Sequence, residues 1–222
     1  MRAVRGDAGV IHLLGFRSAV RNVGDGPLIV RGARPARAAP AMEARQVVRL
    51  TGGGSVAFEG AGRLRYVTSP DHSHWHLSPF QRYRLVRAGD GAEVARDRKS
   101  GFCLGDRYSA DASLPAAPPR PVFRSRCGLG APRLLGLTQG ISVGYGDDYA
   151  AYLEGQALRL TGLPAGRYAL VHRVNENGLL RESRVSNNVA SVLLALSWRA
   201  GRPSVAVLRR CPGSERCEAP PS

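Results

Sequence analysis

Residues 80–95 read FQRYRLVRAGDGAEVA. Two short runs suited to strands, 80–86 and 93–95, flank the segment Ala88-Gly-Asp-Gly-Ala92. Glycine and aspartate between two such runs signal a tight turn. This stretch therefore predicts a β-hairpin.

The same organisation recurs along the chain. Residues 46–50 and 55–58 flank Thr51-Gly-Gly-Gly54, which predicts a second hairpin, and the side chains of 63–67 alternate in polarity. Further short strands are expected at 16–22, 27–30, 158–160, 168–174, 189–196 and 205–208. Since no long segment carries the period of a helix, the sequence predicts an all-β protein, a single antiparallel β-sandwich with long loops.

The length of the chain, 222 residues, fits one domain. We expect it to span residues 1–222, with a core at about 12–211 and a C-terminal tail at 212–222. Two segments rich in alanine, arginine and proline, 31–42 and 105–135, are expected to be loops. A connection as long as the second is unusual in a compact domain unless it has a role.

The charge balance, 32 basic against 17 acidic residues, gives a net charge of +15. Such a charge is compatible with a polyanionic partner. The arginines are scattered singly, however, and no nucleic-acid motif or aromatic platform accompanies them. We therefore expect no nucleic acid partner, and no membrane span, because no apolar run approaches ~20 residues. The protein is expected to be a monomer.

Four cysteines are present, and none forms a CxxC pair, which disfavours a zinc knuckle. The pairs Cys103–Cys127 and Cys211–Cys217 would suit an exported protein, although four cysteines allow three pairings. The N-terminal residues lack the pattern of a signal peptide. We expect a secreted protein whose leader was removed or whose start was misassigned.

Three of the five histidines lie in one pentad, His72-Ser-His74-Trp-His76. Alternate residues of a strand point to the same face, so three imidazoles would project together. Imidazole binds copper, zinc, iron and nickel, and three protein nitrogens leave positions open for chemistry. Two reactions compete at this point: hydrolysis by a zinc-activated water and redox chemistry at copper. A cupin-type iron site is disfavoured because no carboxylate follows at 77–80.

Lysine occurs once, at Lys99, and every other basic residue is arginine. Only lysine carries an amine that can lose its proton and act as a nucleophile. Lys99 is therefore a candidate for chemistry, although a single surface lysine also arises by chance.

Several blocks follow the histidine pentad in order. They are Phe80-x-x-Tyr83-x-Leu85, RKSGFCLGD at 98–106, TQGISVG at 138–144 with Asp147-x-Tyr149, Pro164-x-Gly166-x-Tyr168, and Glu182-Ser183 with Asn187-Asn188-Val189. In their order and joint presence these blocks resemble the lysyl oxidase family, the copper- and quinone-dependent amine oxidases. The resemblance covers most of residues 12–211, with unmatched stretches at 31–65 and 105–135.

The resemblance implies roles for particular residues. His72, His74 and His76 would be the copper ligands. Lys99 and Tyr149 would form the lysyl tyrosylquinone cross-link, since an ungapped alignment of 137–161 places Tyr149, and neither Tyr145 nor Tyr152, at the cofactor position.

The resemblance also implies a reaction: a primary amine, either peptidyl lysine or a small amine, and O₂ would give an aldehyde, ammonia and hydrogen peroxide. Asp147 or Asp148 is the nearest carboxylate in sequence for the base that removes a proton. These two residues with Glu154 would form a local acidic patch able to attract a cationic substrate.

The chain departs from the family pattern in three ways. It has fewer cysteines than the animal enzymes, and its spacing from His76 to Phe80 is one residue shorter. The segment from Lys99 to Tyr149 is longer, so the cross-link requires the loop at 105–135 to fold back. Two alternatives to the oxidase stay open: a metal-binding β-sandwich without the quinone, and a zinc hydrolase with three histidine ligands.

Overall fold

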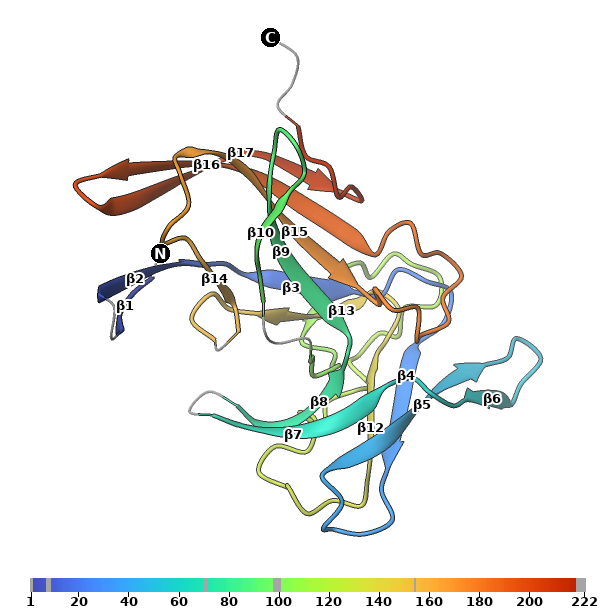
Figure 1. Ribbon diagram of the computed structural model, residues 1–222. Coiled ribbons are helices and arrows are strands. Elements are labelled where there is room, and N and C mark those ends of the chain that lie inside the picture. Colours follow the sequence, from blue (N-terminus) through green and yellow to red (C-terminus); the bar gives the residue numbers. More distant parts are fainter. Residues whose placement is uncertain (1, 7–8, 70–71, 98–100, 154, 219–222) are drawn as a thin grey trace.

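A computed structural model of the chain describes residues 2–6, 9–69, 72–97, 101–153 and 155–218 (Figure 1). Strands are the regular structure of these residues, and every strand pair is antiparallel. The predicted all-β class is therefore confirmed. No helix in this part of the chain is long and apolar enough to cross a membrane.

One large sheet has five strands in the order β10-β9-β15-β16-β17. Their bounds are β9 Gln81–Arg87, β10 Glu93–Arg96, β15 Gly166–Val174, β16 Val189–Arg199 and β17 Arg202–Pro212. The hairpin predicted from residues 80–95 is confirmed, since Glu93 of β10 pairs with Val86 of β9. Leucines and tyrosines from β9, β15 and β16 pack together on one face of this sheet. Tyr83, Leu85 and Leu194 are among the buried members of this cluster.

A second large sheet has six strands, in the order β12-β4-β5-β7-β8 with β6 beside β5. Their bounds are β4 Leu28–Ala33, β5 Ala41–Arg49, β6 Ser55–Phe58, β7 Arg63–Ser69, β8 His72–Ser78 and β12 Gly136–Ile141. The second predicted hairpin, β5 with β6, is also confirmed. The largest hydrophobic cluster lies against this sheet and includes Met42, Leu64, Trp75 and Leu77.

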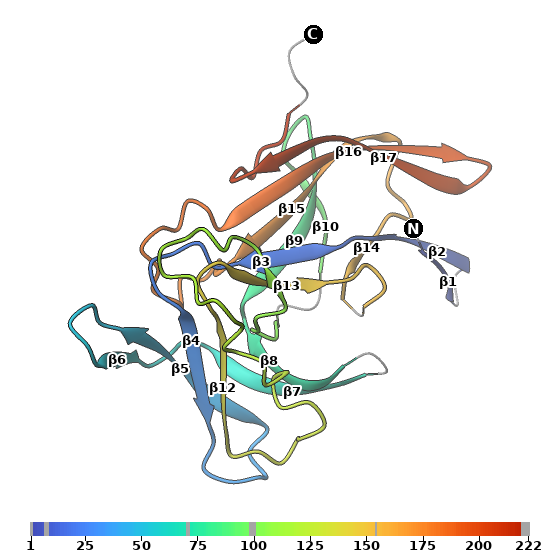
Figure 2. The same ribbon diagram turned by 180° about the vertical axis from the view of Figure 1, so that it is seen from behind.

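Two three-stranded sheets complete the fold, in the orders β11-β13-β3 and β1-β2-β14. Their bounds are β1 Arg2–Gly6, β2 Gly9–Gly15, β3 Ser18–Arg21, β11 Tyr108–Ser109, β13 Tyr145–Tyr149 and β14 Ala157–Arg159. Figures 1 and 2 show β3 and β13 between the two large sheets from both sides. The predicted single sandwich is not confirmed, because the strands form several sheets arranged in a ring.

The ring arises where two paired segments bend together. The chain passes from β3 into β4 and from β12 into β13. The same two segments therefore pair as β3 with β13 in one sheet and as β4 with β12 in another. Asn22 fixes the corner: its N–H donates to Tyr145 O, its carbonyl accepts Gly144 N–H, and its side-chain amide donates to Ile141 O. Gly144 has a φ of 75°, and a Cβ there would meet Asp111 O at 2.3 Å, so glycine allows the bend.

The long connection 105–135 folds back, as the resemblance requires. Cys103 and Cys127 form a disulfide across its base, and Cys211 pairs with Cys217, so of the three possible pairings the structure has the one that would suit an exported protein. The buried carboxylate of Asp106 accepts hydrogen bonds from the N–H groups of Val122, Phe123 and Ser142. The connection is thereby tied to the turn between β12 and β13.

Candidate metal and cofactor centre

The imidazoles of His74 and His76 meet on one face of β8. Their Nε2 atoms are 2.7 Å apart and their ring centroids 4.6 Å apart. His76 is buried, with 2% of its surface exposed, and His74 is half-buried. Strand β8 is aligned by β7 in a continuous register from Arg63–Ser78 to Ser69–His72. His72 begins β8, but its side chain lies outside the described part of the structure.

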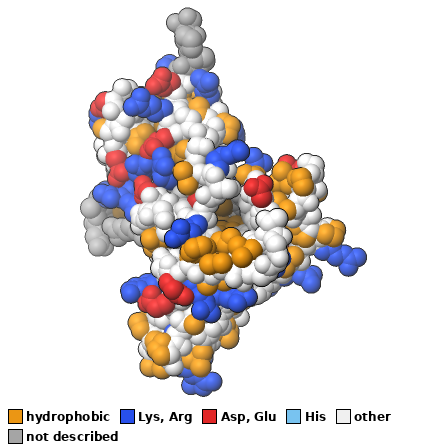
Figure 3. All heavy atoms as spheres, turned by 90° about the vertical axis from the view of Figure 1, so that its right-hand side faces the viewer, with side chains coloured by type: hydrophobic (Ala, Val, Ile, Leu, Met, Phe, Trp, Pro, Cys, Tyr) orange, Lys and Arg blue, Asp and Glu red, His pale blue; other side chains and the backbone are white. Residues whose placement is uncertain are grey.

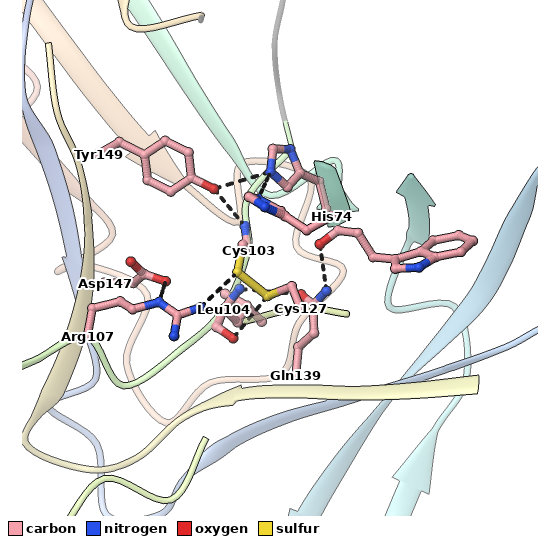
Figure 4. The surroundings of a disulfide bond; sticks show 10 residues. His74, Cys103, Leu104, Arg107, Cys127, Gln139, Asp147 and Tyr149 are labelled. Atoms are coloured by element: carbon pink, nitrogen blue, oxygen red, sulfur yellow. Dashed lines mark hydrogen bonds and ion pairs between the residues drawn. A yellow bond between two sulfur atoms is a disulfide. The ribbon is translucent and has the colours of Figure 1, made fainter. Parts of the chain in front are cut away.

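Tyr149, at the end of β13, points its hydroxyl at this pair (Figure 4). Its Oη lies 3.3 Å from His76 Nε2 and accepts the backbone N–H of Cys103 at 3.0 Å. Burial raises the pKa of the Tyr149 phenol well above its ordinary value, while the Cys103 N–H opposes this shift. The expected cofactor tyrosine and two of the expected metal ligands are therefore brought together.

The segment just after Lys99 lies between β8 and Tyr149. Phe102 forms a β-bridge with Leu77, and its ring lies 4.5 Å from that of Tyr149. A Cβ on Gly101 would meet His76 Cβ at 3.0 Å, so the backbone passes directly beside the histidine. Lys99 itself lies outside the described residues.

Gln139 of β12 joins these elements, although sequence analysis predicted no role for it. Its amide donates to Trp75 O at 2.7 Å, and its Oε1 accepts the N–H of Leu104 at 3.3 Å. The side chain is fully buried, so each bond satisfies a group that water cannot reach. Gln139 thus connects the histidine strand to the segment that contacts Tyr149.

Asp147 shares a face of β13 with Tyr149 and is 3% exposed. Burial raises the pKa of its carboxyl to about 7, and Arg107, whose Nε is 3.5 Å from Oδ2, opposes the rise. Figure 4 shows this pair beneath the tyrosine. Arg107 had no signal in the sequence, because an isolated arginine in an arginine-rich loop is not distinctive.

The expected acidic patch is not formed by its two described members. Asp147 is buried against Arg107, and Asp148, on the opposite face of β13, pairs with Arg17 at 3.2 Å. Glu154, the third expected member, lies outside the described residues. Both described carboxylates are therefore already paired with arginine.

The remaining histidines have structural positions. His172 stacks on Tyr83 at 4.5 Å and contacts Gln81 Oε1 through Nε2 at 3.0 Å. Burial lowers the pKa of His172 to about 4, so its ring is neutral at physiological pH. His12 contacts the ring of Trp198 edge-on.

The two described imidazoles fit a shared ion. Nitrogen ligands about 2.0–2.1 Å from one ion lie about 2.8–3.4 Å apart at angles between square and tetrahedral. The separation of 2.7 Å between the Nε2 atoms is close to that range. Among the described side chains no group of three His, Cys, Asp or Glu gathers around one point, and this search did not include the His72 side chain.

The antiparallel strands, together with the two histidines that meet a tyrosine, define an all-β protein with a candidate metal and cofactor centre. Comparison with known proteins identifies its family. The profile of the lysyl oxidase family matches residues 61–201, and the chain belongs to that family. Relatives include protein-lysine 6-oxidase from Rattus norvegicus, 33% identical over 122 residues, which are 53% of this chain and 25% of the rat protein. The same protein from Sus scrofa is 32% identical over 53% of this chain and 42% of its own length.

A further relative is lysyl oxidase homolog 1 from Homo sapiens, 32% identical over 119 residues. Those residues are 53% of this chain and 18% of the human protein. The chain therefore matches less than half the length of each of these relatives.

Proposed function

We propose that this chain is a copper- and lysyl tyrosylquinone-dependent amine oxidase. It would convert a primary amine, either peptidyl lysine or a small amine, with O₂ and water into an aldehyde, ammonia and hydrogen peroxide. The observation that carries the proposal is the approach of Tyr149 Oη to 3.3 Å from His76 Nε2, with the segment following Lys99 packed against both residues.

His72, His74 and His76 would hold the copper. The convergence of two Nε2 atoms supports this assignment for His74 and His76. His72 is included because it lies two residues before His74 in the same strand, β8, the spacing at which strand residues are expected to share a face. The name protein-lysine 6-oxidase, borne by relatives, supports an oxidoreductase over a zinc hydrolase.

Lys99 would supply the amine of the cross-link to Tyr149. It precedes Gly101, which lies against His76, by two residues, a span of at most about 7 Å of extended chain. A lysine side chain attached at that point is long enough to approach the tyrosine ring. The bond from Cys103 N–H to Tyr149 Oη would hold that ring in place.

Copper held by the histidines would supply the redox chemistry that converts Tyr149 into a quinone with O₂, and that quinone would supply the electrophilic carbonyl that protein side chains lack. Asp147 would take the α-proton of the bound amine, because it is buried on the Tyr149 face and has a pKa of about 7. Arg107 would stabilise the ionised carboxylate through its contact with Oδ2.

The cross-link can be tested without measuring activity, because the chain has only one lysine. A lysine-specific protease cuts the unmodified, reduced chain once, into residues 1–99 and 100–222. We expect protein expressed with copper in air to resist this cut and to form a coloured adduct with phenylhydrazine. The cross-linked peptide should contain both Lys99 and Tyr149, with one oxygen gained and four hydrogens lost.

Two variants make this test specific. Tyr149→Phe should restore cleavage after Lys99 and abolish the coloured adduct. Tyr152→Phe, at a tyrosine that is 71% exposed, should behave like the unaltered chain. Complete cleavage after Lys99 in copper-loaded protein would overturn the oxidase and favour a metal-binding module without the quinone. A bound zinc ion together with hydrolytic activity would favour the zinc hydrolase.

We also propose that the protein is exported. Two disulfides and no free cysteine among the described residues support an oxidising compartment. Mass spectrometry of the protein from culture medium and cell extract would test this location.

A further inference from the structure

An arginine lies on the same sheet face as the histidine pair. Arg65 of β7 is directly opposite His76 of β8, and Val67 is opposite His74. Residues directly opposite in an antiparallel pair share a face, with Cβ atoms about 4.5–5.5 Å apart. The side chain of Arg65 is exposed, whereas that of His76 is buried. The guanidinium therefore lies at the solvent side of the candidate centre.

Among His74, His76, Asp147 and Tyr149, only His74 is not buried. Tyr149, His76 and Asp147 are each less than 5% exposed. His74 is half-buried, and its cross-strand neighbour Val67 is half-buried too. A small molecule that approaches His74 along this face comes close to Arg65.

Arg65 is also available to bind a ligand. It makes no ion pair with any described residue, although Arg63, two residues earlier on the same face, pairs with Glu43 at 2.9 Å. The two carboxylates expected to attract a cation, Asp147 and Asp148, are already paired with Arg107 and Arg17. Among the described residues named here, the charge that makes no ion pair is therefore the positive charge of Arg65.

We infer that the amine accepted by this site carries a carboxylate, which Arg65 binds. This inference rests on the proposed oxidase function and specifies its substrate class. Guanidinium binds carboxylate with two parallel hydrogen bonds and stays charged at any physiological pH. An ω-amino carboxylate would place its amine toward Tyr149 while its carboxylate stays at the exposed guanidinium.

A pair of matched substrates tests this assignment. We expect copper-loaded protein to oxidise 6-aminohexanoate with a kcat/KM on the order of tenfold above that of hexylamine, as expected of one charge-assisted pair. Arg65→Gln should bring this ratio close to one. Arg63→Gln, which alters the neighbouring ion-paired arginine, should leave the ratio unchanged.

Binding separates this inference from the proposed function. The Lys99→Arg chain cannot form the cross-link, so calorimetry on it measures binding of 6-aminohexanoate without turnover. We expect binding that is lost in the double variant with Arg65→Gln. If no amine is oxidised but this binding is found, the oxidase proposal fails and the carboxylate site stands. The inference would be overturned if Arg65→Gln left the kcat/KM ratio of 6-aminohexanoate to hexylamine unchanged. Preferential oxidation of 1,6-diaminohexane over 6-aminohexanoate would overturn it too.

Discussion

At Asp147, burial and an ion pair act on the same carboxyl in opposite directions. Burial is the larger effect and raises its pKa to about 7, while Arg107 opposes the rise. A base must be ionised to accept a proton, so kcat/KM for hexylamine should increase with pH through about 7. Asp147→Asn should lower kcat by roughly 10²–10⁴-fold and remove this pH dependence.

The phenylhydrazine reaction is the control, because forming that adduct requires no α-proton removal. Asp147→Asn should still form the adduct, and Asp148→Asn, at the exposed neighbour, should retain amine oxidation. An Asp147→Asn variant with an unchanged pH profile would show that another group is the base.

The same carboxyl links stability to pH. Its pKa is raised in the folded chain from 3.8 to about 7, so the folded state holds the proton more tightly than the unfolded state. The stabilisation is therefore complete below pH ~4 and is lost as pH rises through about 7. Between pH 5 and 8 the Tm of the unaltered chain should fall relative to that of Asp147→Asn. Parallel thermal unfolding curves would contradict this shift.

Gln139 shows how one buried amide positions a site built by other elements. Replacing it with alanine leaves Trp75 O and Leu104 N–H without their partner, at a cost of about 1–3 kcal/mol for each buried group. We expect Gln139→Ala to lose stability in urea and to cross-link incompletely. Gln46→Ala, which breaks a comparable pair of bonds to Arg181, should cross-link normally. Equal cross-linking in the two variants would refute a positioning role.

At the level of elements, the hairpins and the strand that carries the histidines were predictable, but the disulfide pairing and strands β12 and β13 were not. The hairpins are local, and their turn residues mark them. Strands β12 and β13 contain glycine where neighbours approach closely: a Cβ on Gly140 would meet Leu28 O at 2.5 Å. Glycine lowers strand propensity, so sequence reasoning identified these residues only through family resemblance. Phe102, which bridges to Leu77, had no strand pattern.

The two disulfides should differ in what they control. Cys103–Cys127 spans 24 residues beside the centre, and loop entropy predicts about 3–4 kcal/mol of stability, against about 2 for the six-residue span of Cys211–Cys217. The double variant Cys103→Ser with Cys127→Ser should be less stable in urea and lose the Lys99 cross-link. The matched variant Cys211→Ser with Cys217→Ser should keep it. Loss of the cross-link in both variants would mean that the bond beside the centre has no special role.

Over the whole molecule, the charge of +15 is spread rather than concentrated. On the face drawn in Figure 3, basic side chains are scattered among acidic and neutral ones. Every ion pair in the described part joins an arginine to a carboxylate, and the described arginines outside these pairs are exposed, except for Arg34. The net field should therefore repel a polycation at distances within a Debye length of about 10 Å at 0.1 M salt.

This field makes a prediction that depends on ionic strength. For a lysine-rich peptide, kcat/KM should rise several-fold between about 10 mM and 200 mM salt, because screening weakens the repulsion. For 6-aminohexanoate, which has no net charge at neutral pH, the long-range effect should be small. Stopped-flow measurement of peroxide release with both substrates tests the difference. A peptide rate that falls as salt is added would show that acidic groups near the centre outweigh the arginine surface, and would restore peptidyl lysine as the favoured substrate.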